Sequence, residues 1–279
     1  MYGKIKRLDK IFDAKSNHTI IVPMDHGATV GPIKGLNSLG DTLKHFKNEF
    51  VNGVVLCKGQ LNDIDIMKNC HVPIIVHLSN SSLLSPFPNF KTLVGSVEEA
   101  IAIGADAISV HINLGADNEH TMIHDVGKVA DACFRWGMPL LVMTYVRGNK
   151  VTENPDSIKL AARISQEIGA DIVKVNYTGD IESFQDVVSG VSIPVVAAGG
   201  GYDDPISVIQ TANDIMIAGA SGISFGRKVF QSMDPTKLTE ALSMVVHKTH
   251  TLEEAIQHIQ LSDNYVEASD AYRLSQKCS

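Results

Sequence analysis

Cysteine is scarce in this sequence and is not arranged in pairs. The four cysteines stand far apart, at Cys57, Cys70, Cys133 and Cys278, and none belongs to a Cys-x-x-Cys motif. Disulfide-rich secreted domains and structural zinc sites both need more closely organised cysteines. We therefore predict free or buried thiols in a reducing compartment, with neither a disulfide framework nor a zinc site.

Long apolar runs and basic clusters are also missing. No segment approaches the roughly 20 apolar residues that span a bilayer, and Met1–Arg7 lacks the apolar core of a signal peptide. The net charge is −7 without a basic block, which disfavours nucleic acid as a partner. We expect a cytoplasmic protein with no membrane or nucleic-acid partner.

The segments that are present alternate between short apolar strands and helices. The expected strands cover residues 19–24, 54–57, 73–79, 107–112, 139–145, 172–175, 194–198 and 222–225. The expected helices lie near 1–15, 36–49, 60–69, after the cap Ser96, and at 118–136, 155–168, 181–190, 205–218, 235–248 and 252–260. Eight such strand–helix units are typical of a (β/α)₈ barrel, the TIM barrel of the α/β class.

Two further features favour the barrel over a doubly wound open sheet. The dinucleotide fingerprint Gly-x-Gly-x-x-Gly does not open the first helix. A weak repeat, seen in Gly104–Asp106, Gly169–Asp171 and Gly219–Ser221, joins a helix end to a strand start each time. The length of 279 residues suits one barrel. We predict a single domain over 1–279, with an N-terminal helix at 1–15 and a polar C-terminal tail near 262–279.

Polar residues gather where the expected strands end. In a barrel these carboxyl ends form the active face. The residues there are Asp25, His26, Lys58, His77, Ser79, His111, Asn113, Tyr145, Arg147, Lys174, Asn176, Gly199, Gly200, Gly201, Gly226 and Arg227. This enrichment predicts an enzyme, because strand ends at the opposite face have no need of such groups.

The last two strands end in glycine-rich segments, Gly199–Gly201 and Gly226–Arg227, which we call the glycine loops. Glycine lets backbone N–H groups approach an anion closely, and Arg227 adds a guanidinium. The loops after strands seven and eight commonly bind phosphate in barrels. Tight turns alone would also explain the glycines, but both loops together with an arginine favour a phosphate site.

Three histidines at strand ends, His26, His77 and His111, raise the possibility of a metal centre. None of them belongs to a His-x-His or Glu-x-x-His pair, and few carboxylates stand nearby in the pattern. Hydrogen-bonding histidines are therefore the favoured interpretation, and we predict no metal.

One lysine stands inside an apolar strand. Lys174 lies between Val173 and Val175, and burial of a charged amine is costly. A desolvated lysine is more readily neutral, and a neutral amine can attack a carbonyl carbon. An ion-paired lysine at a strand end is the alternative. The other strand-end lysine, Lys58, precedes Gly59 and is expected at the solvated rim.

Five segments carry a family resemblance. They are Val22–Gly27, Met143–Gly148, Asp171–Gly179, Pro194–Gly200 and Gly222–Arg227. In this order they resemble the class I aldolases of the DeoC/FbaB superfamily. The branch that holds archaeal-type fructose-bisphosphate aldolase and 2-amino-3,7-dideoxy-D-threo-hept-6-ulosonate synthase is the most similar. The resemblance runs from about residue 5 to residue 260. Where the family commonly has Gly-Gly-Pro-Lys, this chain has Gly200–Asp203 and no lysine.

The resemblance implies roles for individual residues. Lys174 corresponds to the Schiff-base lysine, and Asp25 and Tyr145 to proton-transfer groups. The phosphate would be held by the glycine loops, through Gly199, Gly200, Gly201, Gly226 and Arg227. The remaining substrate contacts would come from His26, His77, Ser79, His111, Arg147 and Asn176. The resemblance also implies a homo-oligomer, and the Schiff-base chemistry needs no cofactor.

The substrates expected from the resemblance are a phosphorylated ketose donor and an aldehyde acceptor. The segment His77–Ser79 resembles the heptulosonate synthase branch and favours an amino-aldehyde such as aspartate semialdehyde. Fructose-bisphosphate aldolase is the first alternative. A thiolase-like acyl transferase of the same superfamily and a sugar-phosphate-binding barrel without catalysis are the others.

Overall fold

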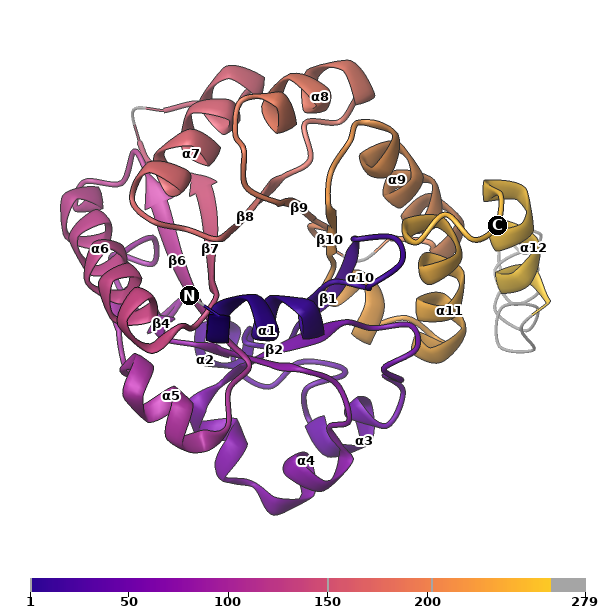
Figure 1. Ribbon diagram of the computed structural model, residues 1–279, viewed down its shortest axis with the longest axis horizontal. Helices are drawn as coiled ribbons and strands as arrows, with labels where there is room; N and C mark the ends of the chain where they lie inside the picture. Colours follow the sequence, from indigo (N-terminus) through magenta and orange to yellow (C-terminus); the bar gives the residue numbers. More distant parts are fainter. Residues whose placement is uncertain (1, 150, 202, 262–279) are drawn as a thin grey trace, which may run out of the picture.

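A computed structural model describes residues 2–149, 151–201 and 203–261 of the chain. Eight parallel strands close into a barrel in the order β1-β10-β9-β8-β7-β6-β3-β2, with helices around it (Figure 1). The strands are β1 Thr19–Pro23, β2 Gly53–Cys57, β3 Ile74–His77, β6 Ala107–Leu114, β7 Leu140–Val146, β8 Ile172–Asn176, β9 Val195–Ala198 and β10 Gly222–Ser224. The predicted (β/α)₈ barrel is confirmed. The single-domain assignment over 1–279 stays a prediction, and its tail at 262–279 lies outside the described residues.

The helices follow the sequence pattern closely, with one exception. They are α1 Tyr2–Ile11, α2 Gly27–Val30, α3 Leu39–Leu43, η1 Lys58–Asn62, α4 Ile64–Asn69, α5 Val97–Ile103, α6 Glu119–Trp136, α7 Pro155–Glu167, α8 Ile181–Ser189, α9 Pro205–Ile217, α10 Arg227–Phe230, α11 Pro235–Val246 and α12 Leu252–Gln260. As expected, Ser96 caps α5 by accepting a hydrogen bond from the Glu99 N–H.

The helix expected over 36–49 is wrong for most of its length. Only α3 forms there, and its N-cap Ser38 caps no backbone N–H, because its hydroxyl donates to Asp41 instead (2.6 Å). Beyond α3 the backbone tightens, since the Phe46 N–H bonds to the Leu43 carbonyl three residues earlier. Such turns do not propagate an α-helix.

The sequence pattern also gave no sign of a small hairpin between β3 and β6. Its antiparallel strands are β4 Ser79–Asn80 and β5 Thr92–Leu93. Strands of two residues are too short for an alternating pattern to indicate them. This hairpin stands above the carboxyl ends of β3 and β6 and becomes important for the site.

The repeated turns between helix and strand are as predicted. Gly104, Gly169 and Gly219 all have positive φ, at 96°, 106° and 89°. This left-handed conformation ends a helix with little strain only at glycine. Each turn then delivers the chain directly into β6, β8 or β10.

Two apolar clusters sandwich the barrel wall. Alternate strand residues such as Val173 and Val175 pack outward under the helices, whereas Ile172 packs inward with residues of the other strands. Because side chains alternate along a strand, Lys174 faces the barrel interior like Ile172. Ile11 of α1 belongs to the inner cluster, so α1 closes the amino end of the barrel, across which it lies in Figure 1.

Cys57, Cys70 and Cys133 are free thiols, as expected. Burial raises the pKa of Cys133 to about 12, which makes it inert. Among residues 2–149, 151–201 and 203–261, no helix is both long and apolar enough to cross a bilayer.

Candidate active site

A cavity of about 390 Å³ opens at the carboxyl ends of the strands. The residues predicted from the sequence that are found in its lining are Asp25, His26, His77, Ser79, His111, Tyr145, Arg147, Lys174, Asn176, Gly199, Gly200, Gly226 and Arg227. Every predicted catalytic or binding residue except Gly201 lines the cavity, whereas Lys58 and Asn113, which were noted only as strand-end residues, do not. The barrel thus brings together groups that lie up to 202 positions apart in the sequence, from Asp25 to Arg227, and every barrel strand except β2, either itself or through the segment after it, contributes to the lining.

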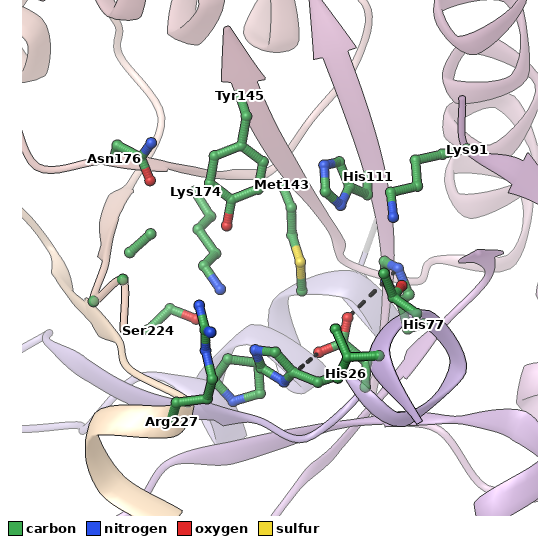
Figure 2. A pocket seen from close by; sticks show the side chains of 18 of the residues that line it. His26, His77, Lys91, His111, Met143, Tyr145, Lys174, Asn176, Ser224 and Arg227 are labelled. Carbon is green, nitrogen blue, oxygen red and sulfur yellow. Dashed lines mark ion pairs between the residues drawn. The ribbon is translucent and has the colours of Figure 1, made fainter. Parts of the chain in front are cut away.

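Lys174 enters this cavity from the middle of β8. It is only 5% exposed, and its strand neighbours are Met143 on β7 and Val196 on β9. Among the described residues, no carboxylate oxygen lies within 4.0 Å of its amine, so the ion-paired alternative is not what the structure shows. Figure 2 shows Lys174 and Tyr145 pointing into the cavity together.

Asp25 and Tyr145 approach from opposite sides of the barrel. Asp25 follows β1, and Tyr145 lies on β7, four places away in the ring of eight strands. The Asp25 carboxylate is 3.7 Å from His77 Nε2 and 3.8 Å from His26 Nδ1. Burial favours its neutral form, but His77, His26 and Lys174 oppose that effect, and the net result is a lowered pKa for Asp25. Asp25 is therefore a carboxylate at neutral pH.

The residues at the ends of β3 and β6 form a hydrogen-bonded group. His77 Nδ1 shares a hydrogen bond with Ser109 Oγ (2.8 Å), and the backbone N–H of His111 donates to Ser79 Oγ (2.8 Å). His111 Nε2 contacts Asn113 Oδ1 at 2.8 Å. Burial lowers the pKa of His77, and burial together with Lys91 lowers that of His111 well below its ordinary value. Both imidazoles are thus neutral hydrogen-bonding groups.

We call this part of the cavity, with Lys91 of the hairpin, the histidine side; its members are His77, Ser79, Lys91 and His111. In the described part of the chain, no three His, Cys, Asp or Glu residues are grouped as a metal site would require. The absence of a metal stays a prediction.

Tyr145 is held by its neighbours rather than by hydrogen bonds. Its ring lies 4.9 Å from that of His111, and the Arg147 guanidinium sits 4.3 Å above the ring centre. A guanidinium over an aromatic face is attractive and orients both groups, so Arg147 helps to hold the Tyr145 ring in its position in the cavity.

Asn176, at the end of β8, donates from Nδ2 to the Glu153 carboxylate (2.8 Å).

The glycine side consists of Gly199, Gly200, Gly226 and Arg227, which follow β9 and β10. Gly200 has a φ of 75°, and a Cβ on Gly226 would lie 2.7 Å from the Pro23 carbonyl oxygen. Both positions therefore demand glycine. Arg227 is exposed and has no carboxylate partner among the described residues. The glycine side lines the cavity with one cation, Arg227, and with the three glycines.

Five polar lining residues were missed by the sequence interpretation: Thr29, Asn80, Lys91, Ser224 and Gln231. Lys91 belongs to the hairpin that no pattern indicated. Ser224 ends β10 and its buried hydroxyl has no partner among the described residues; a serine at the end of a barrel strand is a signal that could have found it. The segment Gly200–Asp203 has no lysine of its own, but Lys228 lies beside it and forms an ion pair with Asp203 (3.1 Å).

The family model for DeoC/LacD family aldolases matches residues 19–232, most of the barrel. The chain belongs to this aldolase family. It is 38% identical over 258 residues to 2-amino-3,7-dideoxy-D-threo-hept-6-ulosonate synthase 1 of Archaeoglobus fulgidus, covering 92% of this chain and 96% of the relative. It is 37% identical over 253 residues to 2-amino-4,5-dihydroxy-6-oxo-7-(phosphonooxy)heptanoate synthase of Streptomyces griseus, covering 90% and 92%.

A solved structure with a similar fold is that of an archaeal fructose-1,6-bisphosphate aldolase. Its catalytic lysine is covalently bound to the carbinolamine intermediate of the substrate. The TM-score is 0.79 at 29% identity, covering 88% of this chain and 99% of the other. The predicted membership of the class I, Schiff-base-forming aldolases is confirmed. The roles of individual residues in this DeoC/LacD family aldolase stay predictions.

Proposed function

We propose that Lys174 forms a Schiff base with a phosphorylated ketose and that the enzyme makes or breaks the adjacent carbon–carbon bond. The observation that carries this proposal is the buried Lys174 amine, free of any described carboxylate within 4.0 Å, inside a cavity that Asp25 and Tyr145 also line. The amine attacks the donor ketone, and loss of water gives an iminium. The iminium withdraws electrons, so the neighbouring carbon–carbon bond can break or form through an enamine.

Proton transfer falls to the two groups that face each other across the barrel. Asp25 is charged at neutral pH and serves as the base, whereas the Tyr145 phenol is a proton donor. Together they move protons during carbinolamine dehydration and during bond formation at the enamine. The neutral imidazoles of His77 and His111 hydrogen-bond to substrate oxygens.

The donor phosphate binds on the glycine side. The open backbone at Gly199, Gly200 and Gly226 and the guanidinium of Arg227 supply the donors for phosphate oxygens. Gly201 does not line the cavity, so we leave it out of the proposed phosphate-binding residues. Binding energy from the phosphate positions the ketone against Lys174.

The acceptor that we propose is an amino-aldehyde such as aspartate semialdehyde. Two relatives, at 38% and 37% identity, are named as synthases of 2-amino seven-carbon acids, and the fructose-bisphosphate aldolase in comparison is 29% identical. A product with an amino group and a carboxylate requires an acceptor that brings them. A fructose bisphosphate would instead demand a second phosphate site.

The proposal is tested by borohydride reduction in the presence of candidate ketose phosphates, followed by mass spectrometry of the labelled peptide. We expect the adduct on Lys174 alone, and Lys174→Ala abolishes labelling and turnover. Lys58→Ala is the matched control, because Lys58 pairs with Glu99 (3.0 Å) outside the cavity. An adduct on Lys58, or turnover without any adduct, contradicts the Schiff-base mechanism.

The homo-oligomer implied by the family resemblance stays a prediction. Sedimentation velocity of the purified chain measures it directly.

A further inference from the structure

Lys91 is a buried cation that the proposed chemistry does not use. It belongs to the β4–β5 hairpin, is 7% exposed, and lines the cavity. Its amine donates to Ser81 Oγ at 2.6 Å, and Ser81 in turn donates to the Pro88 carbonyl. In the described part of the chain, no carboxylate oxygen lies within 4.0 Å of this amine. A buried ammonium without a paired anion is costly.

The carboxylates near Lys91 are engaged by other groups. Asp125, which lines a small adjoining cavity with Lys91, lies 3.7 Å from His124 Nδ1. Asp25 lies between His77 and His26 and also interacts with Lys174. At the rim, the Glu153 carboxylate accepts from Asn176. Arg147 meanwhile adds a second positive charge close enough to act on Lys91. The histidine side therefore has a surplus of positive charge.

The position of Lys91 is opposite the glycine side. The hairpin follows β3 and precedes α5 and β6 in the chain. Strands β3 and β6 are sixth and fifth after β1 in the ring, whereas β10 and β9 are first and second. Lys91 and Arg227 are consequently separated by half the barrel, with Lys174 between them on β8. In Figure 2 Lys91 and Arg227 enter the cavity from opposite sides. A phosphate held at Arg227 leaves Lys91 available for a different anion.

We propose that Lys91 is a specificity-determining residue that binds the carboxylate of the acceptor aldehyde. This inference rests on the proposed function and deepens it by naming the group through which the acceptor is selected. Lys91 uses one of its three donors on Ser81, and the other two are available for carboxylate oxygens. Burial lowers the pKa of Lys91 while Asp25 opposes this shift, so an incoming carboxylate would relieve an unfavourable environment.

Lys91 could instead serve only to fasten the hairpin through Ser81, and the experiment separates the two roles. Acceptor kinetics are measured with aspartate semialdehyde and with butanal, a neutral aldehyde of the same chain length. For Lys91→Met we expect kcat/KM to fall roughly ten- to a hundred-fold with the carboxylate acceptor and to change little with butanal. The loss should lie mainly in the acceptor KM. Lys91→Arg should restore part of the preference, and Lys58→Met is the control for loss of a lysine elsewhere.

A binding measurement keeps the proposal independent of turnover. L-homoserine, a non-reacting alcohol with the same amino acid group, is titrated calorimetrically into wild type and Lys91→Met. We expect binding to weaken at least ten-fold in the variant. Equal binding to both, no binding to wild type, or an equal kinetic loss with both aldehydes overturns the proposal.

Borohydride labelling of Lys174 distinguishes this failure from that of the proposed function. Lys91→Met should still be labelled by the ketose phosphate, because the donor does not need Lys91. If labelling is lost in this variant, Lys91 acts on the donor and the assignment is wrong. If wild type binds L-homoserine through Lys91 but forms no adduct, the Schiff-base proposal fails while the carboxylate site stands.

Discussion

The glycine side and the histidine side of the cavity are built in different ways. The glycine side comes from two short segments directly after β9 and β10, and its backbone and Arg227 face the cavity without any intermediary. The histidine side depends on relayed contacts, in which Ser109 and Asn113 hold His77 and His111, and Ser81 holds Lys91. The glycine side depends on the conformation of two short segments. The histidine side depends on hydrogen bonds between side chains.

This difference has a consequence for how each side recognises a ligand. Glycine loops offer N–H groups to any anion of suitable size, so they suit a group common to many metabolites, such as phosphate. Buried side chains that are fixed by partners reject ligands that leave them unpaired. Selectivity among acceptors is therefore expected on the histidine side, and general affinity for phosphorylated donors on the glycine side.

The largest effect should come from Asp25, which stands between the two sides. Asp25→Asn removes the base and the negative charge that His77, His26 and Lys174 surround. We expect kcat to fall by about 10² to 10⁴-fold, the usual range for loss of a general acid or base. Circular dichroism should show an intact fold. A variant that retains more than a tenth of wild-type turnover would assign proton transfer to another group.

A smaller and more selective effect is expected on the glycine side. Arg227→Ala should weaken the binding of donors that carry a phosphate by roughly ten- to a hundred-fold, because a charged hydrogen bond contributes that much to affinity. Unphosphorylated donors should be affected much less, which KM values for both kinds of donor will show. Equal losses for both would place the phosphate elsewhere and remove the contrast between the sides.

The smallest effect concerns stability and arises from the histidine side. Burial lowers the pKa values of His77 and His111 below the ordinary value of 6.5, so the unfolded chain takes up protons at a higher pH than the folded one. The free energy of unfolding should therefore decrease as the pH falls below about 6.5, by about 1.4 kcal/mol for each unit of lowered pKa. The lowered pKa of Asp25 acts in the same direction at more acidic pH.

Urea unfolding of wild type and His111→Gln between pH 8 and pH 5 will measure this dependence. His111→Gln should have a shallower decline, because one buried imidazole no longer titrates. Parallel curves for the two proteins would show that other groups govern the pH dependence.

The sequence was sufficient for the barrel and for the glycine side because both depend on local signals. Apolar strands recur eight times, the glycine turn into a strand recurs at Gly104, Gly169 and Gly219, and each repeat supports the others. Asp25 and Tyr145 could be placed because each lies at or next to the end of a strand, and Lys174 because it interrupts the apolar run of β8. A barrel brings all strand ends together.

Lys91 could not be found in this way. It precedes a strand of two residues, and only the pairing of Ser79 with Leu93 brings it over the cavity. The helix expected at 36–49 failed for another reason, because α3 ends at Leu43, where bonds to the carbonyl three residues earlier, such as that from the Phe46 N–H to Leu43, replace the α-helical pattern.

Helix α1, which packs Ile11 into the amino end of the barrel, makes the interior a dead end rather than a passage. In the proposed mechanism, donor, acceptor and product therefore pass through the opening at the carboxyl ends of the strands, between the glycine side and the histidine side. Lys174 is buried, whereas Arg147 and Arg227 stand exposed at this opening. The acceptor follows the donor through the same opening, and the covalent bond to Lys174 proposed above keeps the donor fragment in place while the acceptor enters and the product leaves.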